Sequence, residues 1–291
     1  MAAFDHERLM SELMGIDERA GVSVLTRSIM GKEIPLITLG KGKRAVAMIA
    51  CQRGDESKSS AVLLAFIKDY LAHLSRRAAV LEYSVERLFE ERRIYLVPML
   101  NPDGVDYALH GVSELNPLRD RLLEMNNGED FSRWRANARG VDLARNYEVG
   151  FMEYRALNAT LNGAPEGFCG EYPESEPETA SLCRFLRFKK DELCGVLSLG
   201  TGGDELLCGC GETMTAKIMS AGRILSRMSG FRLVRPEQIT PGAGLGEWCT
   251  VQLGKPAYSF KCGEAVSKKA HGSRLLYERV RNALFSFAYL V

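Results

Sequence analysis

Short apolar runs alternate with longer segments of helical periodicity along most of this sequence. The runs Ala45–Cys51 and Ile94–Met99 are bounded by charged or turn residues, which is typical of buried strands. Between them, Ser57–Leu74 carries its apolar residues at helical spacing and predicts an amphipathic helix. The same reasoning predicts two more short strands and a closing helix, at Val196–Leu199, Ala257–Phe260 and Ser273–Leu290.

This alternation predicts an α/β fold with a mixed, twisted β-sheet and helices on both faces. The chain has 291 residues and contains no repeat, low-complexity segment or linker that would divide it, so we expect a single domain over residues 1–291. In such sheets, ligands bind beyond the carboxyl ends of the strands. The residues that follow Cys51, Met99, Leu199 and Phe260 are therefore where chemistry is expected.

The composition of the chain indicates which classes of partner to exclude and in which compartment to expect the protein. Apolar residues make up 46% of the chain and the formal net charge is only +1, which argues against a nucleic-acid or membrane-surface partner. No apolar run is long enough to span a bilayer, and the N-terminal segment MAAFDHERLMSELMG lacks an apolar signal core. The eight cysteines are too sparse for a disulfide scaffold, so we expect reduced thiols and a cytoplasmic location. The oligomeric state stays open.

Several polar strings follow the predicted strands or lie between them. In chain order they are QRGDES (52–57), NPDGV (101–105), WRANARGVDLARNY (134–147), YPESEPET (172–179), LSLGT (197–201) and YSFKCG (258–263). Taken by themselves, NPDGV is typical of a turn and the acidic PESEPET stretch of an exposed loop that begins a helix.

Together and in this order, the strings resemble the zinc carboxypeptidase family, from about residue 23 to the C-terminus. They look most like the bacterial branch that trims γ-D-glutamyl-diaminopimelate peptides of the cell wall. The resemblance implies a single α/β domain, in agreement with the pattern above. It also implies one zinc ion, bound by a HxxE pair and a later histidine, and a glutamate that acts as general base. Three protein ligands leave a coordination position open for a water molecule, whose pKa the metal lowers.

The sequence departs from this pattern at three of the four positions. Arg53 stands at the first histidine position and Gly200 at the second, while Glu56 is retained. Lys261 stands where the family has its general base, and a tyrosine near the substrate aligns loosely with Leu245. A guanidinium cannot coordinate zinc and glycine has no ligand atom, so we expect no bound metal or other cofactor and no intact catalytic group.

Other residues offer no replacement for the missing ligands. None of the four histidines follows a predicted core strand; they are His6, His73, His110 and His271. Glu264 lies three residues beyond Lys261, an offset that places it on the other face of a continuing strand.

The remaining charges suggest a reorganised site. In the family, the aspartate of the GVD string supports the first histidine, and that position is Asp142; an Arg53–Asp142 ion pair is therefore predicted. Lys261 is expected to lie beside Glu56 and to replace part of the charge of the zinc ion.

Candidate ligand-binding residues also come from the resemblance. Arg145 matches the family residue that holds the substrate's terminal carboxylate, although Ala144 replaces its usual asparagine partner. Either Arg135 or Arg139 matches the arginine that stabilises the oxyanion, and Arg139 is also a candidate for substrate binding. The predicted function is an inactive peptidase-like protein that binds a peptide or small carboxylate in a basic cleft. The alternative is an active metallocarboxypeptidase or cell-wall-peptide peptidase with an altered site.

Overall fold

The computed structural model describes residues 4–158, 162–208, 216–234, 242–263 and 272–291. Its centre is one eight-stranded sheet, ordered β1-β2-β6-β3-β7-β10-β8-β9. The strands are β1 (Gly21–Arg27), β2 (Glu33–Leu39), β3 (Arg44–Ala50), β6 (Arg92–Val97), β7 (Leu193–Gly202), β8 (Glu205–Cys208), β9 (Arg232–Val234) and β10 (Ala257–Gly263). A separate two-stranded sheet pairs β4 (Ala79–Val80) with β5 (Tyr83–Ser84).

The sheet is mixed, as the sequence predicts. Strands β6, β3, β7 and β10 run parallel to one another, while β1, β2 and β6 pair antiparallel, as do β10 and β8. The short strands β8 and β9 pair in parallel. The four central parallel strands therefore bring their carboxyl ends to a single edge.

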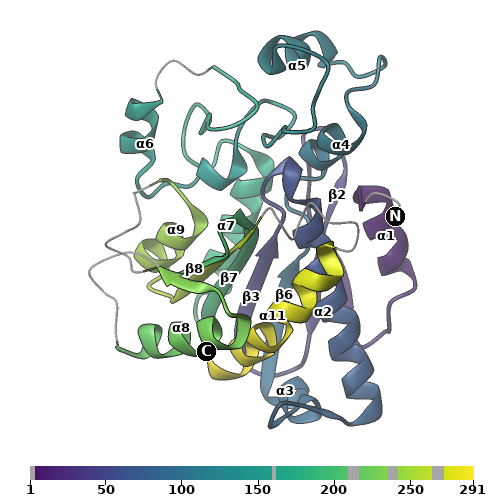
Figure 1. Ribbon diagram of the computed structural model, residues 1–291, viewed down its shortest axis with the longest axis vertical. Helices are drawn as coiled ribbons and strands as arrows, with labels where there is room; N and C mark the ends of the chain where they lie inside the picture. The colour runs from purple at the N-terminus through teal and green to yellow at the C-terminus, as the bar shows by residue number, and fades with distance from the viewer. Residues whose placement is uncertain (1–3, 159–161, 209–215, 235–241, 264–271) are drawn as a thin grey trace.

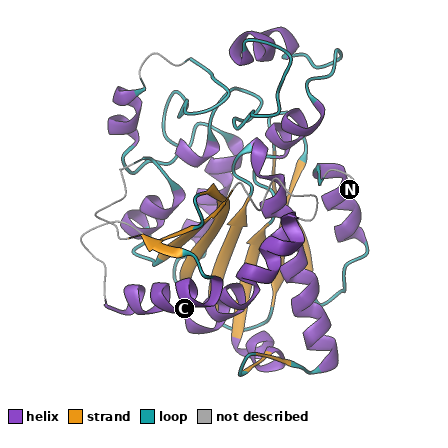
Figure 2. Cartoon of the chain, viewed as in Figure 1, coloured by secondary structure: helices purple, strands orange, loops and turns teal. Residues whose placement is uncertain are grey.

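Helices cover both faces of this sheet (Figures 1 and 2). Alternate residues of β3 pack into two different cores: Val46, Met48 and Ala50 into one, and Ala45, Ala47 and Ile49 into the other. The first core is closed by α2 (Ser57–Arg76) and α11 (Gly272–Leu290), and the second by α7 (Pro177–Phe188) and α9 (Leu245–Gln252). Burial on both faces explains why β3 reads as a continuous apolar run.

The other helices lie at the ends and edges of the sheet. They are α1 (His6–Met14), α3 (Val85–Glu91), α4 (Pro102–His110), α5 (Arg119–Asn126), α6 (Phe151–Leu157) and α8 (Ala216–Ser229), with the 3₁₀ turns η1 (Gly54–Glu56) and η2 (Leu143–Arg145). In Figure 1, α4, α5 and α6 and the loops between them gather at the upper end of the sheet, beyond the tips of the central strands. Among the described residues, no helix is both long and apolar enough to cross a membrane.

Two expectations from the sequence need correction. NPDGV is not a simple turn: Asn101 caps α4 by accepting a hydrogen bond from the Gly104 N–H at 3.0 Å, and Pro102 occupies the first helical position. The PESEPET stretch does begin a helix, α7, but it is not exposed, because Glu176 and Glu178 are both buried.

Close glycine contacts hold the polar strings against one another. A Cβ at Gly54 would lie 2.3 Å from the Gly104 carbonyl oxygen and 2.6 Å from that of Trp134, and a Cβ at Gly104 would lie 2.3 Å from the Ala136 oxygen. Asn101 adds Nδ2–H hydrogen bonds to the carbonyls of Gln52, Arg135 and Ala136, at 3.3, 3.1 and 3.1 Å. Three segments distant in sequence thus form one rigid backbone unit beyond the strand tips.

The cysteines behave as expected for reduced thiols. Seven of them lie in the described part of the chain, where all are free and only Cys194 is less than fully buried. Cys210 lies outside the described residues.

Candidate functional site

The carboxyl ends of β3, β7 and β10 bring the predicted site residues together. In the parallel register Lys261 pairs with Gly200, and Leu199 pairs with both Ala50 and Phe260. Arg53 and Glu56 follow the end of β3 by a few residues, in and just before the turn η1. The chemistry therefore lies at the strand tips where the sequence places it.

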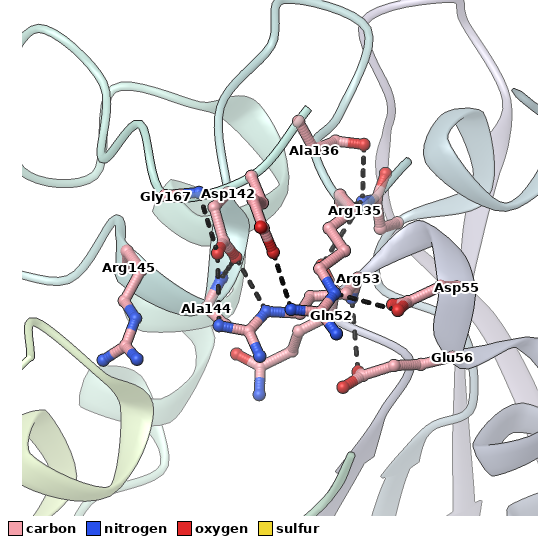
Figure 3. Close-up of polar contacts among 12 residues, drawn as sticks. Gln52, Arg53, Asp55, Glu56, Arg135, Ala136, Asp142, Ala144, Arg145 and Gly167 are labelled. Atoms are coloured by element: carbon pink, nitrogen blue, oxygen red, sulfur yellow. Dashed lines mark hydrogen bonds and ion pairs between the residues drawn. The ribbon is translucent and has the colours of Figure 1, made fainter. Parts of the chain in front are cut away.

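Arg53 and Asp142 form a buried, two-pronged ion pair (Figure 3). Arg53 Nε donates to Asp142 Oδ1 and Arg53 Nη2 donates to Asp142 Oδ2, both at 3.1 Å. Asp142 also accepts hydrogen bonds from the N–H groups of Ala144 (3.1 Å) and Gly167 (3.4 Å). Burial alone would raise the pKa of Asp142, but the Arg53 guanidinium outweighs it and holds that pKa below its usual value. The predicted ion pair is confirmed.

Glu56 is buried and its carboxylate is already engaged. Its Oε1 accepts from the N–H and hydroxyl of Thr201, at 2.8 and 3.3 Å, and its Oε2 accepts from the Arg53 N–H at 3.3 Å. Burial raises the pKa of Glu56, although Arg53 and Lys261 oppose that rise. These bonds turn the carboxylate toward β7.

Gly200 leaves no room for a side chain while Glu56 keeps this position. A Cβ built on Gly200 would lie 2.8 Å from Glu56 Oε1. The Glu56 carboxylate thus fills the space in which a side chain at the second histidine position of the family would begin.

These residues do not fit a zinc site of the family type. A permanent cation stands at one ligand position, no side chain stands at another, and the retained carboxylate is bound to backbone and hydroxyl groups. Within residues 4–158, 162–208, 216–234, 242–263 and 272–291, no group of three His, Cys, Asp or Glu side chains could hold a metal ion.

The described histidines serve other contacts. His6 Nε2 lies 2.7 Å from the Glu33 carbonyl oxygen, His73 Nδ1 lies 2.9 Å from that of Asp69, and His110 Nε2 lies 2.9 Å from Asp5 Oδ2. His271 and Glu264, the other residues weighed as substitutes, lie outside the described residues.

A cavity of about 170 Å³ lies in front of these strand tips. Three cationic side chains line it: Arg53, Arg145 and Lys261. Polar groups on its wall include Gln52 and the hydroxyls of Ser198 and Ser259, whose oxygens are 2.6 Å apart. Leu245, the residue aligned with the family tyrosine, also lines the cavity.

Lys261 does not form the expected ion pair with Glu56. Among the described residues no carboxylate lies within ion-pair distance of its ammonium group, and Glu56 instead receives its hydrogen bonds from Thr201 and Arg53. Burial lowers the pKa of Lys261, and the nearby cations Arg53 and Arg145 oppose the stabilising effect of Glu56. The prediction that Lys261 is bonded to Glu56 is therefore wrong, although both groups lie in the same neighbourhood.

Arg145 lies at the end of η2, apart from the Arg53–Asp142 pair (Figure 3). Its Nη1 donates to the Gly242 carbonyl at 2.8 Å, and its guanidinium carbon lies 5.0 Å from the centre of the Tyr154 ring. Its Nε is buried without a hydrogen-bond partner among the described residues. The guanidinium is thus oriented by a carbonyl and a ring but has no carboxylate partner in the described part of the chain.

The two candidate oxyanion arginines lie in different surroundings. Arg135 donates to Asp55 Oδ2 at 2.8 Å and to Glu166 Oε2 at 2.7 Å, close to Arg53 (Figure 3). Arg139 is about half exposed and lies 3.8 Å from Glu176. Neither lines the cavity. Arg135 is the nearer of the two to the Arg53 cluster, and a role for Arg139 in ligand binding stays a prediction.

Sequence reasoning missed several residues that shape the cavity. Tyr147, the last residue of the WRANARGVDLARNY string, donates a hydrogen bond from its hydroxyl to Gln52 Oε1 at 2.7 Å and fixes that amide. Tyr154 supports Arg145, and Glu247 lines the cavity from α9. Tyr147 belongs to a string that the sequence analysis had identified. Tyr154 and Glu247 belong to no motif, so only the fold shows that they are near the cavity.

Known sequences and structures resemble this chain in sequence and in fold. The chain is 26% identical over 241 residues to γ-D-glutamyl-L-diamino acid endopeptidase 1 of Lysinibacillus sphaericus, covering 82% of this chain and 60% of that protein. It is 27% identical over 242 residues to the uncharacterised protein YqgT of Bacillus subtilis (strain 168), covering 82% and 63%. The chain thus spans about three fifths of the length of these relatives.

Solved structures share the fold at low identity. Thrombin-activatable fibrinolysis inhibitor superposes with a TM-score of 0.72 at 15% identity, over 98% of this chain and 75% of that one. The murein-tripeptide amidase MpaA of Escherichia coli O157 superposes with a TM-score of 0.57 at 20% identity, over 96% and 94%. The zinc carboxypeptidase family model matches residues 7–227, well over half of the sequence. With the strings, the fold and this match in agreement, the chain belongs to the zinc carboxypeptidase family.

Proposed function

We propose that this chain is a non-catalytic member of its family that binds the carboxylate of a peptide or small molecule in the cavity, without zinc. The observation that carries the proposal is the Arg53–Asp142 ion pair. A guanidinium bonded to a carboxylate through two hydrogen bonds occupies the position of a zinc ligand, and its charge cannot be removed at any physiological pH. In this proposal the positive charge of Arg53 takes the place of the family's zinc ion.

The loss of catalysis follows from the groups that are present. Hydrolysis by the family route needs a metal-activated water and a carboxylate base. Lys261, an amine, stands at the base position, and Glu56 has each of its oxygens bonded to neighbouring groups. No described carboxylate lines the cavity except Glu247, whose oxygens accept the N–H groups of Gly242 and Gly244 at 3.1 Å.

Carboxylate binding is supported by Arg145. Its guanidinium lines the cavity, is oriented by the Gly242 carbonyl and the Tyr154 ring, and has no carboxylate partner in the described part of the chain. A guanidinium so held matches a ligand carboxylate in geometry as well as in charge. Since a relative carries the name γ-D-glutamyl-L-diamino acid endopeptidase, a γ-D-glutamyl peptide is the first ligand to test. We place this function in the cytoplasm, where free peptides of this kind would be its ligands.

The proposal can be tested with purified full-length protein. Metal analysis is expected to find zinc well below one ion per chain, and calorimetry is expected to detect binding of a γ-D-glutamyl-diamino-acid dipeptide without hydrolysis. Arg145→Gln should abolish that binding, because it removes the cation that receives the carboxylate. Stoichiometric zinc, together with hydrolysis that a chelator stops and zinc restores, would favour the alternative of an active peptidase with an altered site.

A further inference from the structure

The cavity holds two cations whose charges are not matched by any described carboxylate. Arg53, the third cation on the wall, is already paired with Asp142. The Arg145 guanidinium donates only to a carbonyl among the described residues, and the Lys261 ammonium group has neither an ion pair nor a hydrogen bond there. Both nevertheless line the same 170 Å³ space.

The acidic groups around this space are occupied elsewhere. Glu247 is the only acidic side chain among the described lining residues, and both its oxygens accept backbone N–H groups at the start of α9. Glu56 is directed to Thr201, and Asp142 to Arg53, Ala144 and Gly167. A carboxylate from outside can therefore reach Arg145 and Lys261 without displacing an internal partner.

Polar side chains line part of the cavity, beside apolar ones such as Leu207 and Leu245. Ser198 and Ser259 present hydroxyls from adjacent strands, and Lys261 lies two residues beyond Ser259, on the same face of β10. Gln52 adds an amide that Tyr147 holds in place. These hydroxyl and amide groups can form hydrogen bonds with the polar atoms of a short ligand.

We propose that the cavity selects a ligand with two carboxylates a few atoms apart, one received by Arg145 and the other by Lys261. This inference rests on the proposed function and adds a second anchor to it. The ligand class can arise in two ways: as a free short dicarboxylic acid, or as a peptide that ends in an acidic residue. The second ligand carboxylate is expected because of Lys261 and not because of Arg145. Lys261 brings a cation to the position that matches the family's carboxylate base.

Matched probes separate the two anchors. Glutarate and butyrate have similar carbon chains but carry two carboxylates and one, and N-acetyl-Ala-Glu and N-acetyl-Ala-Gln form the same contrast in a peptide. One added charge-assisted hydrogen bond predicts that wild-type protein binds the dicarboxylate member of a pair about tenfold more tightly. A preference shown only by the peptide pair identifies a peptide ligand, and one shown only by glutarate identifies a free acid; both support a two-anchor site.

Variants then assign the second anchor. Lys261→Met should remove the tenfold preference and leave the affinity for butyrate or N-acetyl-Ala-Gln unchanged. Lys43→Met, a change at an exposed lysine outside this cavity, is the control and should preserve the preference. A thermal unfolding curve for each variant establishes that it is folded.

The outcomes distinguish this inference from the function on which it rests. If both members of each pair bind equally and Lys261→Met changes neither, the second anchor is refuted while carboxylate binding stands. If none of the probes binds, and Arg145→Gln has no effect on any ligand, the proposed function itself fails. Inorganic phosphate binding more tightly than glutarate would also refute a dicarboxylate site.

Discussion

Two groups of charged residues in the site differ in whether their charges are paired. Arg53, which lines the cavity, forms a closed set with Asp142 and Glu56, in which every charged group is bonded to a described neighbour. On the cavity side, Arg145 and Lys261 face open space without a described carboxylate. Breaking a buried pair leaves an uncompensated charge, whereas removing an unpaired cation relieves repulsion and desolvation. Substitutions in the first set should therefore lower the stability of the fold, whereas substitutions of Arg145 or Lys261 should mainly weaken ligand binding.

The largest expected effect is the loss of Arg53. Arg53→Met should lower the free energy of unfolding by about 3–5 kcal/mol, because it leaves Asp142 buried without its cation. Urea unfolding measures this loss, and the double change with Asp142→Asn should recover most of it. The matched control is Arg87→Met, which breaks the exposed Arg87–Glu91 pair and should leave the free energy of unfolding nearly unchanged. Equal losses for the two single variants would contradict the contrast.

Glu178, unlike Asp142, is a buried carboxyl group with no described cation paired to it. Burial raises its pKa to about 8, although the backbone N–H groups of Glu178 and Ile29 oppose that rise. Because the folded pKa exceeds the unfolded one, its contribution to stability is complete below about pH 4.5 and is lost as pH rises toward 8.

Glu178→Gln should therefore become relatively more stable than wild type across this window. The slope is at most about 1.4 kcal/mol per pH unit, and the total change is on the order of 5 kcal/mol. Denaturant unfolding at several pH values measures the difference between the two proteins. A difference that does not depend on pH would show that Glu178 is solvated or paired.

Gly200 tests how tightly the closed set is packed. Gly200→Ala should cost about 1–3 kcal/mol, because the new Cβ would lie 2.8 Å from Glu56 Oε1 and must displace a buried carboxylate. The cost should fall in a Glu56→Ala background, where that carboxylate is absent. Gly203→Ala serves as the control, since the nearest atom to its Cβ is 3.8 Å away. Equal melting temperatures for Gly200→Ala and Gly203→Ala would mean that Glu56 moves aside freely.

The smallest effect on stability is expected at Lys261. Lys261→Met should change the free energy of unfolding by less than about 1 kcal/mol or raise it, because it removes a desolvated ammonium without breaking a described bond. A double-mutant cycle with Glu56→Gln should give a coupling below about 1 kcal/mol. A coupling of several kcal/mol would restore the Lys261–Glu56 ion pair that the sequence suggested.

Much of the fold could be predicted because its central strands are buried on both faces. The apolar runs before Cys51, Met99 and Leu199 mark β3, β6 and β7, although β7 is longer than expected, at Leu193–Gly202. The strands β8 and β9 could not be predicted, since segments of four and three residues show no usable period. The start of α4 was readable from Asn101 and Pro102, yet a turn competes for the same residues.

The site could be predicted in position but only partly in contacts. The strings placed Arg53 and Asp142 around one point, and a guanidinium beside a carboxylate favours a pair with two hydrogen bonds. The orientation of Glu56 depends on which donor its side chain meets, and that donor, the Thr201 N–H, belongs to the backbone of another strand. The burial of Glu178 was hidden for a related reason, because an acidic string looks exposed until the fold covers it.

The interlocked glycines at Gly54 and Gly104 bear on how such sequences are interpreted. A Cβ at either position would lie nearest to a main-chain oxygen, so these two glycines specify the backbone frame around the site. This frame therefore depends on Gly54 and Gly104, and not on the charge of the neighbouring residue 53. Neither glycine is therefore expected to tolerate a side chain, whatever residues stand at positions 53, 200 and 261.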